Sequence, residues 1–176
     1  MNLLPYEQGY LDGLCGVYSV INATRLIHMG MSEEECMRLF GACMRHIETR
    51  KSLGKVSTKG VGTNDIWSML RKIVLHKYKI RVERPFSKIA DHSTKDYLNV
   101  LRDFFNKGKK RAAIISILCD DWDHWTVIRS LSPKRLILFD SSMMKAININ
   151  RCTINKASKR KPYLINIEDT IFLYKD

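Results

Sequence analysis

A cysteine, a histidine and an aspartate occur in this order along the 176-residue sequence, each in a local setting that suits catalysis. Cys15 ends the Gly-rich run that begins at Gln8 (QGYLDGLC), where a loop is expected to turn into a helix. His124 opens the segment HWTVI, and Asp140 follows the apolar segment LILF. A thiol, an imidazole and a carboxylate are the groups from which enzymes build a cysteine nucleophile.

Cys15 is placed where its thiolate form would be stabilised. A helix N-terminus provides partial positive charge from unpaired amides, and an imidazolium provides a full charge. A single cysteine is by default a small buried hydrophobe, but polar Gln8 and Asp12 are an unusual approach to a core position. We therefore expect Cys15 to be a nucleophile, and we expect the Gln8 amide to donate to an oxyanion beside the backbone N–H of Cys15.

His124 and Asp140 are expected to meet across a β-hairpin. The segment 132–134 (Ser-Pro-Lys) separates two apolar runs, as a turn between antiparallel strands does. With the turn centred near residue 132, positions 124 and 140 face each other within about one residue. A carboxylate there would fix the tautomer of an imidazole that acts as general base and acid, with Trp125 covering one side of the ring. The alternatives are a satisfied surface histidine and an aspartate that caps a strand end.

The elements that must position these residues are expected in two groups, helices first and strands second. Apolar residues recur at helical spacing over 14–29, and Ser32 with Glu35 forms a capping box that opens a second helix. Thr63 is expected to cap a third helix, and a fourth spans about 94–106. The inner faces of the last three are predicted to carry Met37, Phe40, Cys43, Met44 and Ile47, then Ile66, Met69, Leu70 and Ile73, then Leu98, Leu101 and Phe105.

The second half of the chain has the pattern of an antiparallel sheet. Strands are predicted over 80–84, 112–118, 124–131, 135–140, 146–149 and 170–174. The acidic segment 120–123 is expected to be a turn, and the polar, Gly-punctuated segment 51–62 is typical of a loop or mobile flap. We predict a single α+β domain over residues 1–176, in which an N-terminal helical half packs on a C-terminal antiparallel β-sheet.

The composition is that of a basic globular protein. Its net charge is +12, and Lys and Arg are concentrated in 107–111 and 151–161. Such a charge favours association with acidic partners, but a solvated surface explains it as well, and no nucleic-acid-binding motif accompanies it. We expect a protein or peptide substrate, acidic if the charge takes part in binding, and no nucleic acid.

The cysteines and the missing targeting signals indicate the compartment. Five scattered cysteines, an odd number, argue against a disulfide framework and for a reducing environment. The sequence shows no signal-peptide pattern and no apolar stretch of bilayer-spanning length, so a cytoplasmic location is expected, with effector-type export as the alternative. Cys36 and Cys43 are two helical turns apart and Cys119 has no second cysteine pair nearby, so we expect no metal ion or other cofactor.

The segment 8–22, with Cys15 followed by GVYSVIN, resembles the nucleophile segment of papain-like cysteine peptidases. The nearest likeness is to the leader-peptide peptidase domains of bacteriocin exporters, which are bacterial proteins in which a strand histidine precedes an aspartate after a hairpin. The resemblance implies a papain-like fold, Cys15 as nucleophile, His124 as general base and acid, Asp140 as the orienting carboxylate and Gln8 as oxyanion donor. It covers about the first thirty residues and 110–145.

The sequence departs from that family in three respects. Gln8 lies one residue farther from Cys15 than the usual interval, and Asp12-Gly13-Leu14 replaces a compact acidic lead-in. The helical middle, 32–106, is longer than a minimal peptidase of this type needs, and no transporter is attached, so leader processing in an exporter is not expected.

The resulting hypothesis is a cysteine-nucleophile hydrolase that cleaves a peptide or isopeptide bond through an acyl-enzyme. Papain-like folds also host glutamine deamidases and acyltransferases, including secreted effectors, and fold does not choose among them. A catalytically inactive basic binding module is the alternative from a different class.

Overall fold

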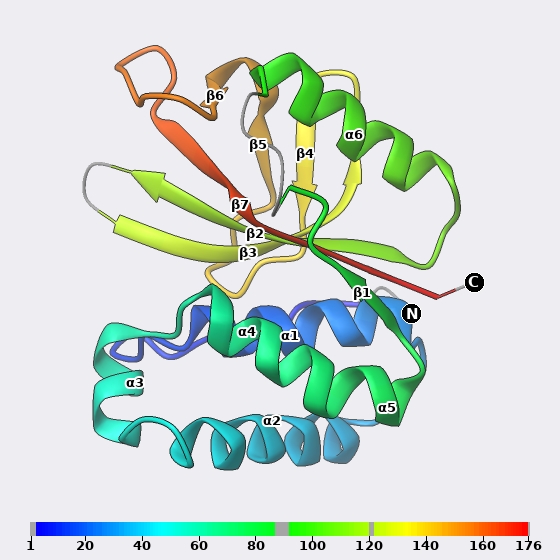
Figure 1. The fold of residues 1–176 in the computed structure, drawn as a ribbon, viewed down its shortest axis with the longest axis vertical. Coiled ribbons are helices and arrows are strands. Elements are labelled where there is room, and N and C mark those ends of the chain that lie inside the picture. The colour runs from blue at the N-terminus through cyan, green and yellow to red at the C-terminus, as the bar shows by residue number, and fades with distance from the viewer. Residues whose placement is uncertain (1–2, 87–91, 120–121, 176) are drawn as a thin grey trace.

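The structure is a computed structural model that describes residues 3–86, 92–119 and 122–175. It is an α+β fold in which a twisted sheet lies between two helical layers (Figure 1). The helices are α1 (Cys15–Ile27), α2 (Glu33–Glu48), α3 (Leu53–Lys59), α4 (Thr63–Met69), the π-helical η1 (Leu70–Val74), α5 (Leu75–Tyr78), α6 (Thr94–Asn106) and the 3-10 turn η2 (Ile149–Arg151). The strands are β1 (Arg81–Glu83), β2 (Arg111–Cys119), β3 (Trp122–Leu131), β4 (Arg135–Leu138), β5 (Ala146–Asn148), β6 (Cys152–Thr153) and β7 (Tyr163–Tyr174).

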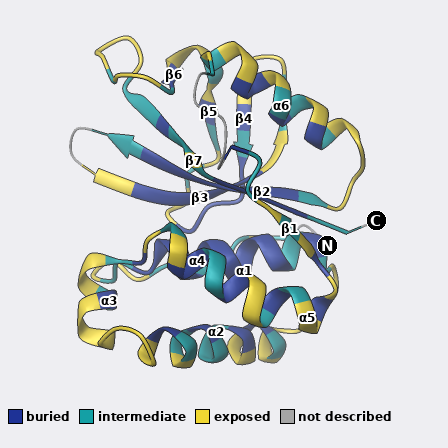
Figure 2. Ribbon diagram, viewed as in Figure 1, coloured by how far each residue is buried: buried dark blue, intermediate teal, exposed yellow. Residues whose placement is uncertain are grey.

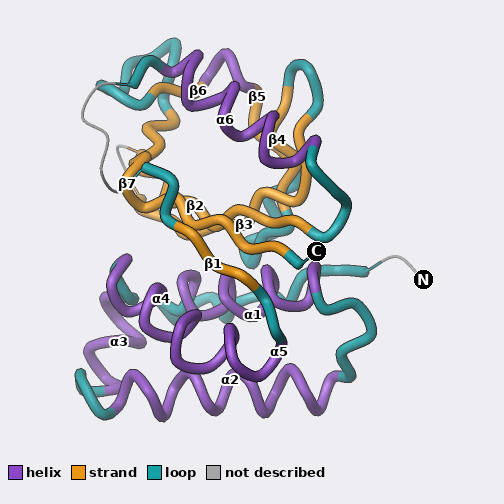
Figure 3. Tube along the Cα trace, turned by 45° about the vertical axis from the view of Figure 1, so that its right-hand side comes forward, coloured by secondary structure: helices purple, strands orange, loops and turns teal. Residues whose placement is uncertain are grey.

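The sheet has the strand order β1-β7-β2-β3-β4-β5, and every pair along this path is antiparallel. The short strand β6 pairs with β7 in parallel, outside the main path. The prediction of an α+β fold with a helical N-terminal half and an antiparallel C-terminal sheet is therefore confirmed. Figure 3 shows the helices α1 to α5 gathered below the sheet, with α6 above it.

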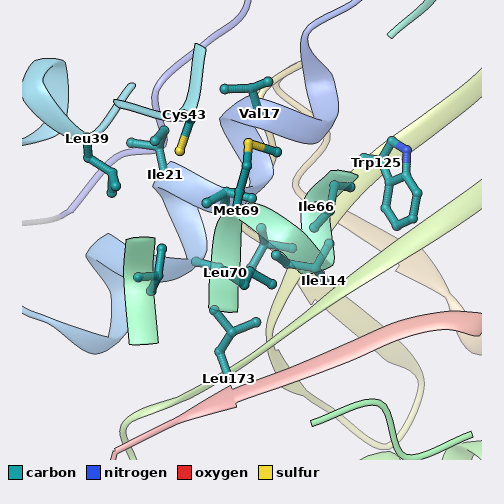
Figure 4. Close-up of a cluster of buried hydrophobic side chains, with 14 of the residues drawn as sticks. Val17, Ile21, Leu39, Cys43, Ile66, Met69, Leu70, Ile114, Trp125 and Leu173 are labelled. Atoms are coloured by element: carbon teal, nitrogen blue, oxygen red, sulfur yellow. The ribbon is translucent and has the colours of Figure 1, made fainter. Parts of the chain in front are cut away.

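The sheet is buried on both faces because two separate cores cover it. Alternate residues of β2 point to opposite sides, so Ala112 and Ile114 join the core under the sheet, whereas Ala113 and Ile115 join the core under α6. The lower core packs α1, α2 and α4 against the sheet through the side chains in Figure 4: Val17, Ile21, Leu39, Cys43, Ile66, Met69, Leu70, Ile114, Trp125 and Leu173. Figure 2 shows the buried central strands and the exposed outer surface of α2 and α3. The predicted helix 94–106 thus lies on the face opposite to the other helices.

Helix α2 begins as predicted but turns a different face inward. Ser32 and Glu35 form the reciprocal capping box. The buried residues are Cys36, Leu39, Cys43 and Ile47. Met37, which was expected inside, is 68% exposed, and Phe40 and Met44 are half-buried. The difference arises because the buried stripe passes through position 36, and the next residue of an α-helix lies about 100° further round.

The other inward-face predictions hold in most positions. Ile66, Met69 and Leu70 are buried and Ile73 is half-buried, as expected at the edge of a stripe. In α6, Leu98 and Leu101 are buried. Phe104 takes the buried place that was predicted for Phe105, and Phe104 stacks on Phe172 of β7.

The prediction of a loop over 51–62 is wrong, because α3 occupies most of this segment. The helix ends at Gly60, whose positive φ of 71° favours glycine. Thr63 is the first residue of α4 and not its cap, which is Gly62. The buried Asp65 carboxylate accepts from the Gly62 backbone N–H and from Lys51 Nζ, at 3.2 Å and 2.5 Å, so it holds both ends of this segment in place.

The strand predictions are correct in place and differ in length. The segment predicted over 170–174 is part of the twelve-residue β7. Of the turn predicted over 120–123, residues 122 and 123 belong to β3, and residues 120 and 121 lie outside the described part of the chain. Strand β4 ends at Leu138, so Asp140 lies two residues beyond it.

Candidate active site

Cys15 is the first residue of α1, as the sequence predicted. The N-cap residue Leu14 provides no side-chain hydrogen bond, and the first amides of a helix have no intrahelical acceptors. Their partial positive charge therefore faces the thiol. Cys15 is 9% exposed, so its sulfur is nearly enclosed but still reaches a surface cleft.

The loop before Cys15 is fixed by Asp12. One carboxylate oxygen of Asp12 accepts from the Leu14 N–H at 3.0 Å, and the other accepts from the Gly9 N–H at 2.7 Å. The Gly13 N–H donates to the Ser57 carbonyl at 2.6 Å, which ties the loop to α3. A side chain at Gly13 would come within 3.1 Å of the Gly60 backbone. The polar lead-in that marked Cys15 in the sequence is therefore a hydrogen-bonded turn that delivers the thiol to the helix end.

His124 and Asp140 form a buried pair. His124 Nε2 lies 2.6 Å from Asp140 Oδ1, and the two residues are 5% and 2% exposed. With Nε2 bound to the carboxylate, Nδ1 is the ring nitrogen left for the thiol; His124 and Cys15 line the same cleft, and Cys15 is near enough to raise the pKa of the imidazole. The structure thus brings the three predicted residues Cys15, His124 and Asp140 together at one site.

The surroundings of His124 and Asp140 shift the pKa values of both residues. Burial lowers the pKa of His124, but the hydrogen bonds and negative charges of Asp140 and Cys15 outweigh it and raise the pKa from 6.5 to about 9. Burial works to raise the pKa of Asp140, but the hydrogen bond and positive charge of His124 lower it overall, helped by the Ser142 N–H. At neutral pH the pair is therefore an imidazolium and a carboxylate.

A one-residue bulge sets the register between β3 and β4. Near the turn Ser130 pairs with Ile137, whereas beyond Arg129 the partner of Ile128 is Leu138. The Phe139 N–H continues this second register by donating to the Val127 carbonyl at 2.8 Å. Extending it by one residue places position 140 opposite position 126.

This register differs from the predicted facing of positions 124 and 140, because the turn is centred later than residue 132; the bulge moves the pairing one residue back towards the predicted register. The bulge has a direct effect on the candidate site. Without it, position 140 would face position 127 and its side chain would point to the other side of the sheet. With it, Asp140 shares a face with Thr126 and His124 and reaches the imidazole diagonally.

The Asp140 carboxylate is fully occupied by donors. Its Oδ2 accepts from the backbone N–H groups of Ser142 and Met144 at 2.8 Å and 3.1 Å, while Oδ1 is bound to His124. An aspartate that caps the strand end was the alternative interpretation of Asp140. The turn after β4 holds one carboxylate oxygen and the imidazole binds the other, so Asp140 does both.

Gln8 lines the same cleft as Cys15. The Ser141 hydroxyl donates to Gln8 Oε1 at 3.2 Å, and the Gln8 backbone N–H donates to the Ser141 carbonyl at 3.0 Å. With its carbonyl oxygen held by Ser141, the side-chain amide presents its NH₂ group, which makes a long 3.5 Å contact with the Asp12 carbonyl and keeps a second hydrogen for another acceptor. Gln8 thus lies at the cleft, and its role as oxyanion donor stays a prediction.

The cleft has a volume of about 350 Å³. One wall is the segment from Thr58 to Val61, which comprises the end of α3 and the two residues after it. The sequence did not predict this helix. The other wall is formed by the ends of β2 and β3, including Ser116 and Asp123. This volume is within the range of pockets that bind small ligands or short chain segments.

Two tryptophans have roles that differ from the prediction. Trp125 does not cover the imidazole: its indole N–H donates to the Val61 carbonyl at 3.0 Å, and it packs near Gly16. The ring beside His124 is Trp122, edge-on with 5.6 Å between centroids. The role of Ser141 was not identified from the sequence, because it depends on where the turn after β4 meets the loop before Cys15.

The remaining cysteines and histidines form no second centre in the described part of the chain. None of the five cysteines is in a disulfide bond, and burial raises the pKa of Cys43 and of Cys152 to about 12 in each case. His46 is hydrogen-bonded to Ser68, and His28 packs on Tyr78. Across residues 3–86, 92–119 and 122–175, no three His, Cys, Asp or Glu side chains are grouped to hold a metal ion.

No protein-family model matches the sequence, and no curated protein matches it significantly. Within the same described ranges, every helix is too short or too polar to cross a membrane.

Proposed function

We propose that the protein is a papain-like cysteine hydrolase that cleaves a peptide or isopeptide bond through an acyl-enzyme. One observation supports the proposal: Cys15, at a helix N-terminus, lines one cleft together with His124, whose imidazole is hydrogen-bonded to the buried Asp140. A nucleophile on a helix that packs against an antiparallel sheet bearing the base is also the arrangement that the resemblance to papain-like peptidases implies.

In the acylation step, the Cys15 sulfur attacks the substrate carbonyl while the imidazolium of His124 stabilises the thiolate. The backbone N–H of Cys15 and the Gln8 amide donate to the oxyanion that develops on the carbonyl. His124 then passes its proton to the leaving amine, and the C–N bond breaks to give a thioester on Cys15.

In the deacylation step, His124 is neutral and takes a proton from water, whose oxygen attacks the thioester. The acid product leaves and the Cys15–His124 pair is regenerated. Asp140 holds Nε2 throughout, so Nδ1 stays directed at the reacting atoms.

Selective alkylation of Cys15 tests the proposal. The full chain is treated with iodoacetamide across a range of pH, and the adducts are located by mass spectrometry. We expect Cys15 to react well below about pH 8 and faster than the half-buried Cys119, which serves as an internal reference. His124→Ala should remove this advantage and leave the labelling of Cys119 unchanged.

Equal, slow labelling of Cys15 and Cys119 at every pH would contradict the proposal and favour a binding module without catalysis. If Cys15 is selectively reactive, the masses of products from a peptide library identify the reaction. Hydrolysis divides a peptide into two products whose masses sum to the substrate plus water. Deamidation of glutamine keeps the chain whole and adds about 1 Da, and acyl transfer leaves the acyl group on a second amine.

A further inference from the structure

A second recess lies on the helical layer and shares no lining residue with the cleft around Cys15 in the described part of the chain. It has a volume of about 390 Å³ and lies between Arg50, in the turn after α2, and one face of the continuous helix formed by α4, η1 and α5. Its principal side chains are Arg50, Trp67, Ser68, Arg71, Lys72 and His76, which we call the basic recess.

The basic recess collects positive charge without a counterpart. Arg50, Arg71 and Lys72 line it, and no carboxylate is among its described lining residues. Within the described chain, none of these three forms an ion pair within 4 Å. Like charges gathered in one recess repel each other, and an anion placed between them relieves this repulsion.

A π-helical turn aligns the side chains of the basic recess. Ser68, Lys72 and His76 are four residues apart, a spacing that advances about 40° per step around a regular α-helix. The wider turn of η1 lies inside this stretch, and it keeps the three side chains closer to one line. Such turns are rare and occur frequently at functional sites, so this one supports a binding role independently of the charge.

Two neighbours hold polar groups of the basic recess in place. The Arg71 guanidinium lies over the ring of the half-buried Trp67, 5.8 Å from its centroid. His46 of α2 is hydrogen-bonded to the Ser68 hydroxyl at 2.8 Å. A guanidinium fork held by an aromatic face is suited to bind two phosphate oxygens at once.

We propose that the basic recess binds a compact ligand that carries several phosphate groups, such as inorganic triphosphate or a nucleoside triphosphate. Its charges surround one concave site and do not form the long stripe that a nucleic-acid backbone requires. The inference is independent of the proposed hydrolase, because it uses none of the residues around Cys15.

Calorimetric titration of the full chain with sodium triphosphate and with ATP, at one constant ionic strength, tests the inference. We expect saturable binding of one ligand per chain, weakened by about tenfold or more in Arg71→Gln/Lys72→Gln, since each charged hydrogen bond contributes strongly. The matched control, Lys107→Gln/Lys109→Gln, removes the same charge elsewhere and should bind as the wild type does. Cys15→Ala should also bind normally, which separates this site from the hydrolase proposal.

The two ligands distinguish the source of the phosphates. Equal affinities indicate recognition of the phosphate chain alone, and a higher affinity for ATP indicates that the nucleoside also makes contact. If circular dichroism shows that the double variant is unfolded, the single variant Arg50→Gln removes a charge of the same recess from the turn after α2 and should also weaken binding. Three outcomes would overturn the inference: no saturable binding of either ligand, equal weakening by both double variants, or binding only to vesicles of anionic lipid.

Discussion

The helical layer α1 to α5 and the sheet each contribute to the candidate active site by a different device. The helical layer supplies Cys15 through a backbone position, the first residue of α1, where the amides themselves provide charge. The sheet supplies His124 and Asp140 as a pair of side chains whose meeting depends on strand register and a bulge. The first device depends on residues close in sequence and the second on residues far apart. Substitutions in the helical layer and in the sheet should therefore affect stability and the reactivity of Cys15 differently.

Gly16→Ala tests the packing of α1 beside the candidate site and has the largest expected effect. An added Cβ would lie 2.4 Å from Val61 Cγ2 and 3.1 Å from Ile66 Cδ1 in the helical half, and 3.3 Å from Trp125 Cδ1 in the sheet, so these neighbours would have to shift. We expect a loss of about 2–3 kcal/mol in the free energy of unfolding, measured with urea. The matched control is Gly54→Ala in α3, whose Cβ would meet nothing within 4 Å and which should be neutral or stabilising. Equal stability of the two variants would contradict close packing at Gly16.

Asp140→Asn alters only the His124–Asp140 pair that the sheet supplies, and it has the next largest expected effect. The substitution removes the charge that raises the pKa of His124, so less imidazolium remains at neutral pH to stabilise the thiolate. We expect alkylation of Cys15 near pH 7 to slow by about tenfold or more. Asp123→Asn makes the same chemical change in a residue that lines the same cleft, and its rate should stay close to that of the wild type. A similar loss in both variants would indicate a general charge effect of the cleft.

The pH dependence of stability sharpens the description of the His124–Asp140 pair. Cys15→Ser removes the thiol, so that His124 titrates against Asp140 alone. A raised folded pKa means that the stabilisation is fully present below the unfolded value of 6.5 and is lost as pH rises through the folded value, which is about 9 in the wild type.

The Cys15→Ser variant should therefore lose stability as pH rises from 6.5 towards 9. The loss is expected to be about 1.4 kcal/mol for each unit by which the folded pKa exceeds the unfolded one. Urea unfolding at a series of pH values measures it, and the added change Asp140→Asn should flatten the slope. Stability that increases over this range would show that His124 is held neutral.

Ser141→Ala has the smallest expected effect. It concerns the contact between the turn after β4 and the loop before Cys15. It removes the donor that orients the Gln8 amide, without touching Cys15 or His124. We expect acylation by p-nitrophenyl acetate to slow by about three- to fivefold, in line with one lost hydrogen bond. Alkylation by iodoacetamide, which develops no oxyanion, should be unchanged. Ser142→Ala, whose contribution is a backbone N–H, is the control and should leave both rates unaltered.

Local signals in the sequence predicted the elements on the helical side well. The capping box of Ser32 and Glu35 and the polar lead-in to Cys15 both appear in the structure with the expected geometry. Helix α3 was missed because only Val56 of its seven residues is buried, which leaves no apolar stripe to read. Its position depends on tertiary contacts instead, such as the Gly13 N–H bond to Ser57.

On the sheet side, the sequence predicted which residues meet but not how they meet. The hairpin was evident, but no residue type around Arg129 marks the bulge that brings Asp140 to the face of His124. The placement of α6 on the opposite face was not predictable either, because a strand buried on both sides, such as β2, does not indicate which helix covers which side.

The position of β7 has a consequence for how the protein folds during its synthesis. This strand follows all the others along the chain, yet it lies between β1 and β2, and β2 in turn supports the strand that carries His124. During ribosomal synthesis Cys15 emerges more than a hundred residues earlier, and domains complete their folding only after their distant partners are made. The nascent chain would therefore carry an unactivated thiol, and Cys15, His124 and Asp140 would come together only when β7 joins the sheet.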